Sequence, residues 1–251
     1  MRKIIPMAVA FTAMLFAQGA RAQTNLQILY DFAPDRQFVT TTVEGFYNDN
    51  WGNTFFFVDH DFNTRDDKNK VYAPSGTYFE IARCLNFWQG TALAPLSLHV
   101  EYNGGVYKGY EINSAFLAGL DFFVHSIDFR NTFNFKVLWK GITYTTQKAP
   151  LQFTFVWGMQ DLFGLKGLRF SGFADFWWED HIVTSGLGDK FLPDISLSHT
   201  VFITEPQLWY NVGRHFGCDN LNIGGEVELS VDFGGTRGFR ARPCAGIKWV
   251  F

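Results

Sequence analysis

Apolar and polar residues alternate along most of the chain, in segments of about ten residues separated by turn-forming residues. In residues 95–104, for example, Leu96, Leu98 and Val100 are separated by polar side chains. Residues 129–140 and 221–233 show the same period of two. Successive side chains of a β-strand point to opposite faces, so this period predicts strands with one apolar and one polar face.

The turn residues divide the chain into twelve predicted strands. They cover residues 25–32, 38–47, 51–61, 77–87, 95–104, 114–124, 129–140, 151–160, 168–179, 198–212, 221–233 and 239–251. Pro206 interrupts the stretch 195–213, and proline removes a donor from a β-ladder, so this stretch is either one long strand or two short ones. Helical periodicity, repeats and linkers are not found after residue 22, which predicts a single all-β domain over residues 23–251.

The composition excludes two other classes of protein. Hydrophobic residues make up 47% of the chain and charged residues 18%, against about a quarter charged in average proteins. A chain with so little charge and so much apolar surface is not disordered. Beyond residue 22 no apolar run reaches the roughly 18 residues of a membrane helix, which excludes a bundle of membrane-spanning helices.

The first 22 residues have the pattern of a secretory signal peptide. Arg2 and Lys3 precede an apolar stretch over residues 4–17, and residues 20–22 read Ala-Arg-Ala, a typical cleavage site. An anchor helix is the alternative, but the apolar stretch is short and no stop-transfer flank follows it. Removal of this segment takes the formal charge from -3 to -6, which disfavours nucleic acid as a partner.

Cysteine and histidine residues form no recognisable motif. Cys84, Cys218 and Cys244 are an odd number without a close pair, so we expect no disulfide framework. The six histidines are not spaced as helical metal ligands, and no transition-metal site or cofactor is expected. The acidic residues of 59–61, with Asp66 and Asp67, are either Ca²⁺ ligands at the outer rim or a solvated acidic loop, and we favour the loop.

Two all-β architectures fit the alternation: a soluble barrel or sandwich with apolar faces inside, and a transmembrane β-barrel with apolar faces toward lipid. Phe and Trp on nearly every apolar face favour lipid and its aromatic girdles. An even number of strands places both termini on the periplasmic side and the longest connections, 62–76 and 180–197, outside. The last strand ends on Phe251, which resembles the signal that outer-membrane barrels present to their insertion machinery. We therefore predict a barrel of the Gram-negative outer membrane, with the lipid bilayer and that machinery as partners.

Three stretches and the C-terminal strand resemble a known family of such barrels. They are DNWGNTFFFVDHDF at 49–62, GTYFEIARCLNFW at 76–88 and LRFSGFADFWWED at 168–180. The chain resembles the nucleoside-specific outer-membrane channel (Tsx-like) family, and within it a branch common in Bacteroidetes. The resemblance implies a twelve-stranded barrel with a narrow lumen that passes nucleosides.

The predicted strand number also limits the lumen. Eight strands are filled by their own side chains and sixteen to eighteen leave a wide channel, so about twelve should admit small solutes selectively. The strand parity places equal numbers of acids and bases inside: Glu80, Glu101, Asp121, Asp175, Glu226, Glu228 and Asp232, against Arg130, Lys136, Lys140, Arg169, Arg240, Arg242 and Lys248. A balanced lumen without a single-sign ring suits a neutral or zwitterionic solute, and nucleosides are one such class.

Aromatic residues on the inner parity either stack against a solute or simply fill the barrel. They are Tyr78, Phe123, Phe173, Trp177 and Trp209. As candidate substrate-binding residues of the lumen we take Glu80, Glu101, Asp121, Arg130, Phe173, Asp175 and Trp177. The last two strands carry opposite charges, which predicts cross-strand ion pairs between Glu228 and Arg242 or between Asp232 and Arg240.

Three functions follow from a barrel of this kind: a passive, selective channel, an enzyme built on the barrel rim, and a structural or adhesive barrel with a closed lumen. His99, His125 and His199 each have Ser or Asp nearby in the sequence, but no G-x-S-x-G or similar context accompanies them. We predict the channel, with small neutral solutes such as nucleosides as partners and no enzymatic activity.

Overall fold

Antiparallel strands account for nearly all regular structure in the computed structural model, which describes residues 22–62, 74–107, 110–185 and 194–251. The strands are β1 (Ala22–Asp31), β2 (Val39–Asp49), β3 (Gly52–Phe62), β4 (Gly76–Leu85), β5 (Leu96–Tyr107), β6 (Tyr110–His125), β7 (Asn131–Ile142), β8 (Leu151–Gln160), β9 (Leu168–Thr184), β10 (Ile195–Thr204), β11 (Gln207–Asn211), β12 (Leu221–Val231) and β13 (Phe239–Val250). Two short 3-10 helices, η2 (Leu162–Gly164) and η3 (Gly213–Phe216), lie in connections. No helix among the described residues is long and apolar enough to cross a membrane.

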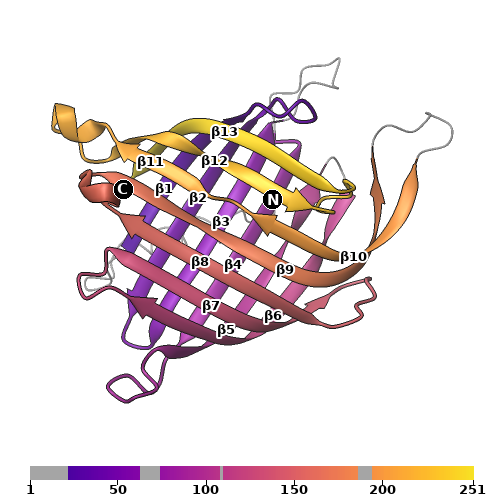
Figure 1. Cartoon of the computed structure of the whole chain (residues 1–251), viewed down its shortest axis with the longest axis horizontal. Helices are drawn as coiled ribbons and strands as arrows, with labels where there is room; N and C mark the ends of the chain where they lie inside the picture. Colours follow the sequence, from indigo (N-terminus) through magenta and orange to yellow (C-terminus); the bar gives the residue numbers. More distant parts are fainter. Residues whose placement is uncertain (1–21, 63–73, 108–109, 186–193) are drawn as a thin grey trace, which may run out of the picture.

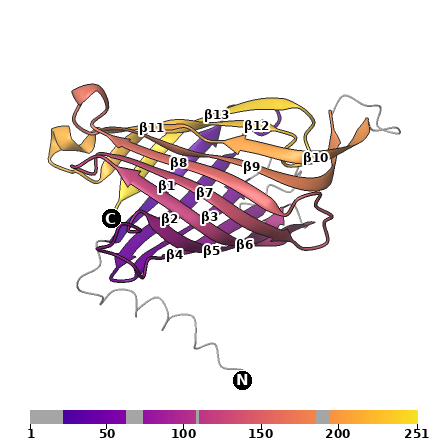
Figure 2. The ribbon, with the colours of Figure 1, turned by 60° about the horizontal axis from the view of Figure 1, so that its bottom comes forward.

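The strands close into one barrel, in which neighbours in the sequence pair except at β10 and β11, and β13 returns to β1. In Figure 2, indigo β1 lies next to yellow β13, the strand with which it pairs. β10 and β11 together fill one place between β9 and β12, so the wall has twelve strand positions (Figure 1). The predicted twelve-stranded, all-β barrel is confirmed.

The break between β10 and β11 answers the question that Pro206 raised. The strand position is continuous but its strand is interrupted at residues 205–206. The wall stays hydrogen-bonded there, because the Glu205 N–H donates to the Phe173 carbonyl (3.1 Å) and the Val227 N–H to the Pro206 carbonyl (3.1 Å). The proline therefore costs the wall a ladder donor without opening it.

The two faces of the wall have opposite character, as β7 illustrates. Phe135, Val137 and Trp139 each keep 51% of their surface exposed, whereas Leu138 keeps 0% and Lys140 7%. The apolar face is thus the outer one and the polar face the inner one, which is the arrangement of a membrane barrel and the reverse of a soluble sandwich. The same alternation holds in β5, where Leu98 and Val100 are exposed and His99 is buried.

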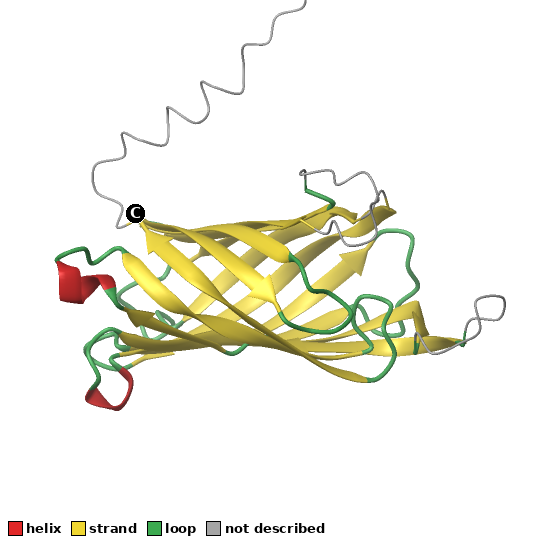
Figure 3. Cartoon of the chain, turned by 90° about the horizontal axis from the view of Figure 1, so that it is seen from above, coloured by secondary structure: helices red, strands yellow, loops and turns green. Residues whose placement is uncertain are grey.

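The connections divide between the two ends of the barrel as predicted. The C-terminus and both 3-10 helices lie at one end, which we call the C-terminal end (Figure 3). The longest connections, between β3 and β4 and between β9 and β10, join strands at the opposite end, which we call the loop end. Of the predicted signal peptide, residues 1–21 lie outside the described residues. Its last residue, Ala22, begins β1.

Candidate lumen site

Carboxylates from β4 and β5 meet inside the barrel at mid-height. Glu80 faces Asn103 in the register of the two strands, and the Asn103 amide donates to Glu101 (3.2 Å). The Tyr78 hydroxyl donates to Glu80 Oε1 (2.7 Å), and His99 Nε2 lies 2.9 Å from Glu101 Oε2. Two of the predicted site residues, Glu80 and Glu101, therefore lie in two polar groups on adjoining strands of this part of the wall.

β7, β8 and β9 bring a lysine and an unpaired acceptor to the same interior. The Lys140 ammonium donates to Gln152 Oε1 (2.8 Å) and lies 3.7 Å from the centre of the Trp177 ring. Asp175, two residues before Trp177, is half-buried, and its Oδ1 atom is buried without a hydrogen-bond partner among the described residues. A buried acceptor without a donor is costly unless a solute or water satisfies it.

Trp177 and Phe173, the two predicted aromatic site residues, pack into the wall. Trp177 is 7% exposed and contacts Val201 and Ile203, and Phe173 packs against the same cluster. The Trp177 indole N–H donates to Glu179 Oε2 (2.8 Å). With Lys140 over one face, the Trp177 ring belongs to the filled part of the interior, and its role in binding stays a prediction.

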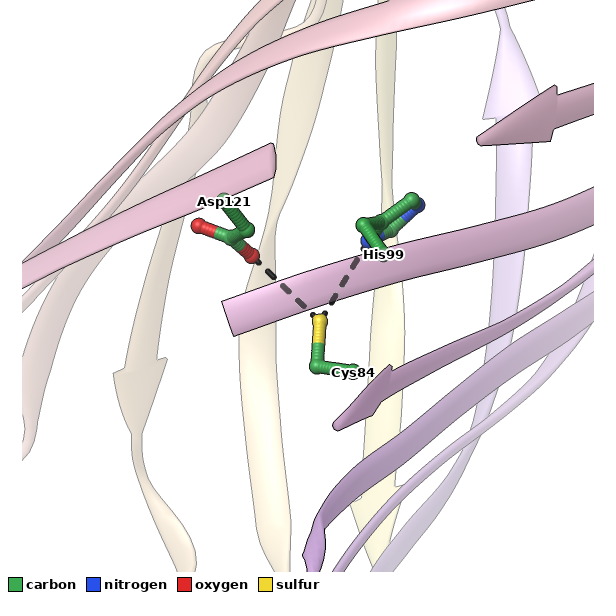
Figure 4. A group of neighbouring side chains, drawn as sticks. All are labelled: Cys84, His99 and Asp121. Atoms are coloured by element: carbon green, nitrogen blue, oxygen red, sulfur yellow. Dashed lines mark hydrogen bonds between the residues drawn. The ribbon is translucent and has the colours of Figure 1, made fainter. Parts of the chain in front are cut away.

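Asp121 lies apart from Glu80 and Asp175, nearer the C-terminal end of the barrel. Its Oδ1 atom accepts a hydrogen bond from the Asn134 amide (2.8 Å), and its Oδ2 atom accepts one from the Cys84 thiol (3.4 Å). The thiol also lies 3.3 Å from His99 Nδ1, so Cys84, His99 and Asp121 form one buried group (Figure 4). The sequence showed no metal site, because these three residues lie on three strands and only the register brings them together.

The placement of Arg130 inside the lumen is wrong. β7 begins at Asn131, two residues later than predicted, so Arg130 lies in the turn that precedes it. Its side chain is 58% exposed and pairs there with Asp128 (3.4 Å). Asp232 likewise lies in a connection, where it accepts hydrogen bonds from the Gly238 N–H (2.6 Å) and the Ser198 hydroxyl (2.7 Å) and not from Arg240.

The predicted balance of inner charges is also wrong, because several acids were missed. Thr42 donates to Asp59 (2.5 Å), Thr40 donates to Asp61 (2.7 Å), and both acids share the inner face of β2 and β3. The further inner acids are Asp31, Glu44 and Glu205. Asp59 and Asp61 lie in a strand and not in a solvated loop, and Asp66 and Asp67 fall outside the described residues. The described interior therefore carries more acids than bases.

One family of proteins matches nearly the whole chain after the predicted signal peptide. Its model, described as a domain of unknown function (DUF5020), matches residues 23–251. The chain belongs to this family. No curated protein matches the chain. The family description contains no substrate, so the resemblance to nucleoside channels stays a prediction.

Solved structures similar to this DUF5020 barrel include two at low sequence identity. One comes from work entitled "Unveiling the Mechanism Behind the in-meso Crystallization of Membrane Proteins", with 7% identity, a TM-score of 0.46, and coverage of 91% of this chain and 83% of that one. The other is the high-pH structure of Pseudomonas putida OprB, with 10% identity and a TM-score of 0.41. That likeness covers 86% of this chain and 60% of OprB.

The β1–β2 connection of the DUF5020 barrel folds against the inner wall at the loop end. Arg36 pairs with Asp31 on β1 (3.3 Å) and with Glu228 on β12, although β13 lies between these two strands. Burial alone would lower the pKa of Arg36, but these carboxylates raise it above its ordinary value. Asp35 shows the opposite balance: burial would raise its pKa, and the hydrogen bonds from Arg242 lower it further than burial raises it. The connection is thus fastened across the mouth by ion pairs.

Proposed function

We propose that this barrel spans the outer membrane and acts as a passive, selective channel for small solutes, with nucleosides as the first substrate class. A membrane location is supported by the apolar outer face of the barrel. On β7, for example, Phe135, Val137 and Trp139 are all exposed there. A band of this kind is stable in lipid and prone to aggregation in water. The support for passage is the polar, charged inner face.

The observation that carries the channel is Asp175 Oδ1, an acceptor buried in the interior without a donor. A solute hydroxyl or amide N–H satisfies it in the way that a side chain satisfies other buried acceptors. Glu80 and Glu101 belong to the same interior and accept further hydrogen bonds. Nucleosides present several hydroxyl and amide donors around a compact ring system, which matches such a set of acceptors.

The charge of the interior narrows the substrate class. Acids outnumber bases among the described inner residues, with Asp59, Asp61 and Glu205 adding to the predicted set. Acidic linings favour cations and disfavour anions. The channel therefore takes neutral or cationic solutes, nucleosides and not nucleotides. It needs no catalytic group, and we propose no enzymatic activity.

The packing of the interior favours a second candidate function, a structural or adhesive barrel with a closed lumen. Leu138, His99 and Trp209 point inward and are at most 1% exposed. Lys248 lies over the Trp209 ring, 4.2 Å from its centre, and fills further space. In such a barrel the connections at the loop end would carry the function by binding a partner.

Swelling of proteoliposomes distinguishes the two functions. We expect vesicles with the refolded barrel to swell faster in a nucleoside than in a disaccharide of the same osmolarity, and Asp175→Asn to reduce the nucleoside rate several-fold. Asp59→Asn is the matched control, because Asp59 is also an inner carboxylate hydrogen-bonded to a threonine, but neither of its oxygens is a buried acceptor without a partner among the described residues. No swelling in either solute, from a barrel that has inserted and folded, would overturn the channel and leave the closed lumen.

A further inference from the structure

Three side chains with metal-ligating atoms converge inside the barrel toward its C-terminal end. Cys84 of β4, His99 of β5 and Asp121 of β6 come from three adjacent strands, and their sulfur, nitrogen and oxygen atoms all lie within 4.8 Å of one another. Figure 4 shows the imidazole and the carboxylate directed at the thiol. The residues are 5%, 1% and 3% exposed respectively, so bulk water does not compete for these atoms.

The sulfur, nitrogen and oxygen atoms are spaced like neighbouring ligands of a tetrahedral metal ion. Cys84 Sγ lies 3.3 Å from His99 Nδ1 and 3.4 Å from Asp121 Oδ2. Tetrahedral Zn²⁺, with bonds of about 2.3 Å to sulfur and about 2.0–2.1 Å to nitrogen or oxygen, places its S and N or O ligands about 3.5 Å apart. Both sulfur distances therefore match a tetrahedral ion, and the nitrogen and oxygen atoms lie within 4.8 Å of each other.

Neighbouring side chains hold the imidazole and the carboxylate in the orientation that a metal requires. His99 Nε2 lies 2.9 Å from Glu101 Oε2, and the tautomer with its proton on Nε2 donates to this carboxylate and turns the Nδ1 lone pair toward Cys84. The Asn134 amide donates to Asp121 Oδ1 (2.8 Å) and leaves Oδ2 free to face the thiol. Hydrogen bonds of this kind, from metal-ligating histidine to a carboxylate and from a donor to a ligating carboxylate, are the usual outer shell of a zinc site.

The group is incompletely satisfied by its own hydrogen bonds. The Cys84 thiol has one proton, and two acceptors, His99 Nδ1 and Asp121 Oδ2, lie next to it. A Zn²⁺ ion bound to the thiolate, the imidazole and the carboxylate satisfies all three at once, and the thiol proton leaves to solvent.

We propose that Cys84, His99 and Asp121 bind Zn²⁺ or a similar borderline-soft divalent ion. Sulfur, nitrogen and oxygen ligands in one buried site suit Zn²⁺ and disfavour Ca²⁺ and Mg²⁺, which take oxygen ligands. The bound ion ties β4, β5 and β6 together. This site stands independently of the channel, since it binds its ion whether or not a solute passes the lumen.

Titration of the refolded mature barrel with Co²⁺, a spectroscopic substitute for Zn²⁺, tests the site. We expect one equivalent per chain, the visible absorption of a tetrahedral ion, and a near-ultraviolet charge-transfer band from the thiolate. Added Zn²⁺ should displace Co²⁺ and raise the temperature at which the barrel unfolds, because an ion that binds only the folded state stabilises it. Absence of the charge-transfer band in the wild-type chain overturns the proposal without any variant.

Variants then locate the site. Cys84→Ser and Asp121→Asn should weaken Co²⁺ binding at least tenfold, and Cys84→Ser should abolish the charge-transfer band. Cys244→Ser is the matched control: Cys244 is another free, partly buried cysteine, and its thiol faces the Arg242 carbonyl (4.0 Å) instead of a histidine. Equal losses in Cys84→Ser and Cys244→Ser would overturn the assignment. Folding of each variant is checked by its heat-modifiable migration on gels.

Discussion

Glu228 and Arg242 face each other across β12 and β13, and Glu228 Oε1 accepts a 2.6 Å hydrogen bond from Arg242 Nη1. Both residues are buried, so this is the predicted cross-strand ion pair in a site shielded from water. Arg242 also forms an ion pair with Asp35 (2.8 Å), and Glu228 also accepts a hydrogen bond from Arg36. The pair therefore joins the barrel wall to the β1–β2 connection at the mouth.

Replacement of Glu228 by Gln should destabilise the barrel. The change keeps the shape of the side chain but leaves the buried guanidinium of Arg242 with a weaker partner. Breaking a buried pair in this way costs about 3 kcal/mol of unfolding free energy. Urea unfolding from lipid vesicles, followed by tryptophan fluorescence, measures the change.

The exposed pair between Arg237 and Asp194 (2.7 Å) provides the control for this prediction. Its two side chains are 34% and 47% exposed, and surface pairs contribute about 1 kcal/mol or less. Asp194→Asn should therefore leave the unfolding free energy nearly unchanged. Equal effects of Glu228→Gln and Asp194→Asn would contradict the role given to the buried pair.

Acid should release the β1–β2 connection from the wall. Arg242 donates two hydrogen bonds to Asp35 Oδ2 (3.0 and 2.8 Å), and the pKa of Asp35 is lowered from its ordinary value of 3.8 although burial acts to raise it. A carboxyl group with a depressed folded pKa stabilises the fold above its unfolded pKa, and this contribution is lost as the pH falls through the folded pKa. We expect the contact to persist at neutral pH and to weaken below pH 3.8.

Comparison of the wild-type chain with Asp35→Asn measures this effect. Hydrogen exchange at the Arg36 amide, which donates to the Ala33 carbonyl (3.0 Å), reports the opening of the connection. The variant should exchange faster at neutral pH, and the two chains should become alike in acid. A difference that grows as the pH falls would have the wrong sign for this account.

The seam that closes the barrel should not tolerate a methyl group at Gly246. A Cβ atom at this position of β13 would collide with the Ile28 carbonyl of β1 and lie 2.9 Å from Leu29 Cα. Gly246→Ala therefore forces the two strands apart. We expect a reduced yield of the compact, heat-modifiable form on refolding into detergent.

Gly104 of β5 is the control for the seam. A Cβ atom there would come no closer than 3.4 Å to its neighbours, the nearest being Ser114 Oγ. Gly104→Ala should refold with nearly the wild-type yield. If it refolds as poorly as Gly246→Ala, close approach at the seam is not the cause.

The sequence predicts the wall of this barrel because alternation is a local property. Phe135 and Val137 indicate the outer face of β7 from its own sequence alone. The strand can therefore be predicted without knowing which strands pair with it. Boundaries are less local, and an error of two residues was enough to place Arg130 in the lumen when it lies in a turn.

The interior sites depend on register, which no single strand contains. Cys84 and His99 are paired residues of β4 and β5, and Asp121 follows on β6, but their meeting is set by how far each strand is displaced along its neighbour. The acids Asp59 and Asp61 were missed for a related reason, because consecutive phenylalanines at 55–57 conceal the parity of their strand.

The reversal potential of the refolded barrel in a planar bilayer, recorded across a KCl gradient, tests the central claim most directly. The account predicts discrete conductance steps, a reversal potential that shows selectivity for K⁺ over Cl⁻ because acids outnumber bases inside, and saturable block by nucleosides but not by sugars of similar size. A properly inserted barrel that conducts no ions, or one that prefers Cl⁻, would contradict it.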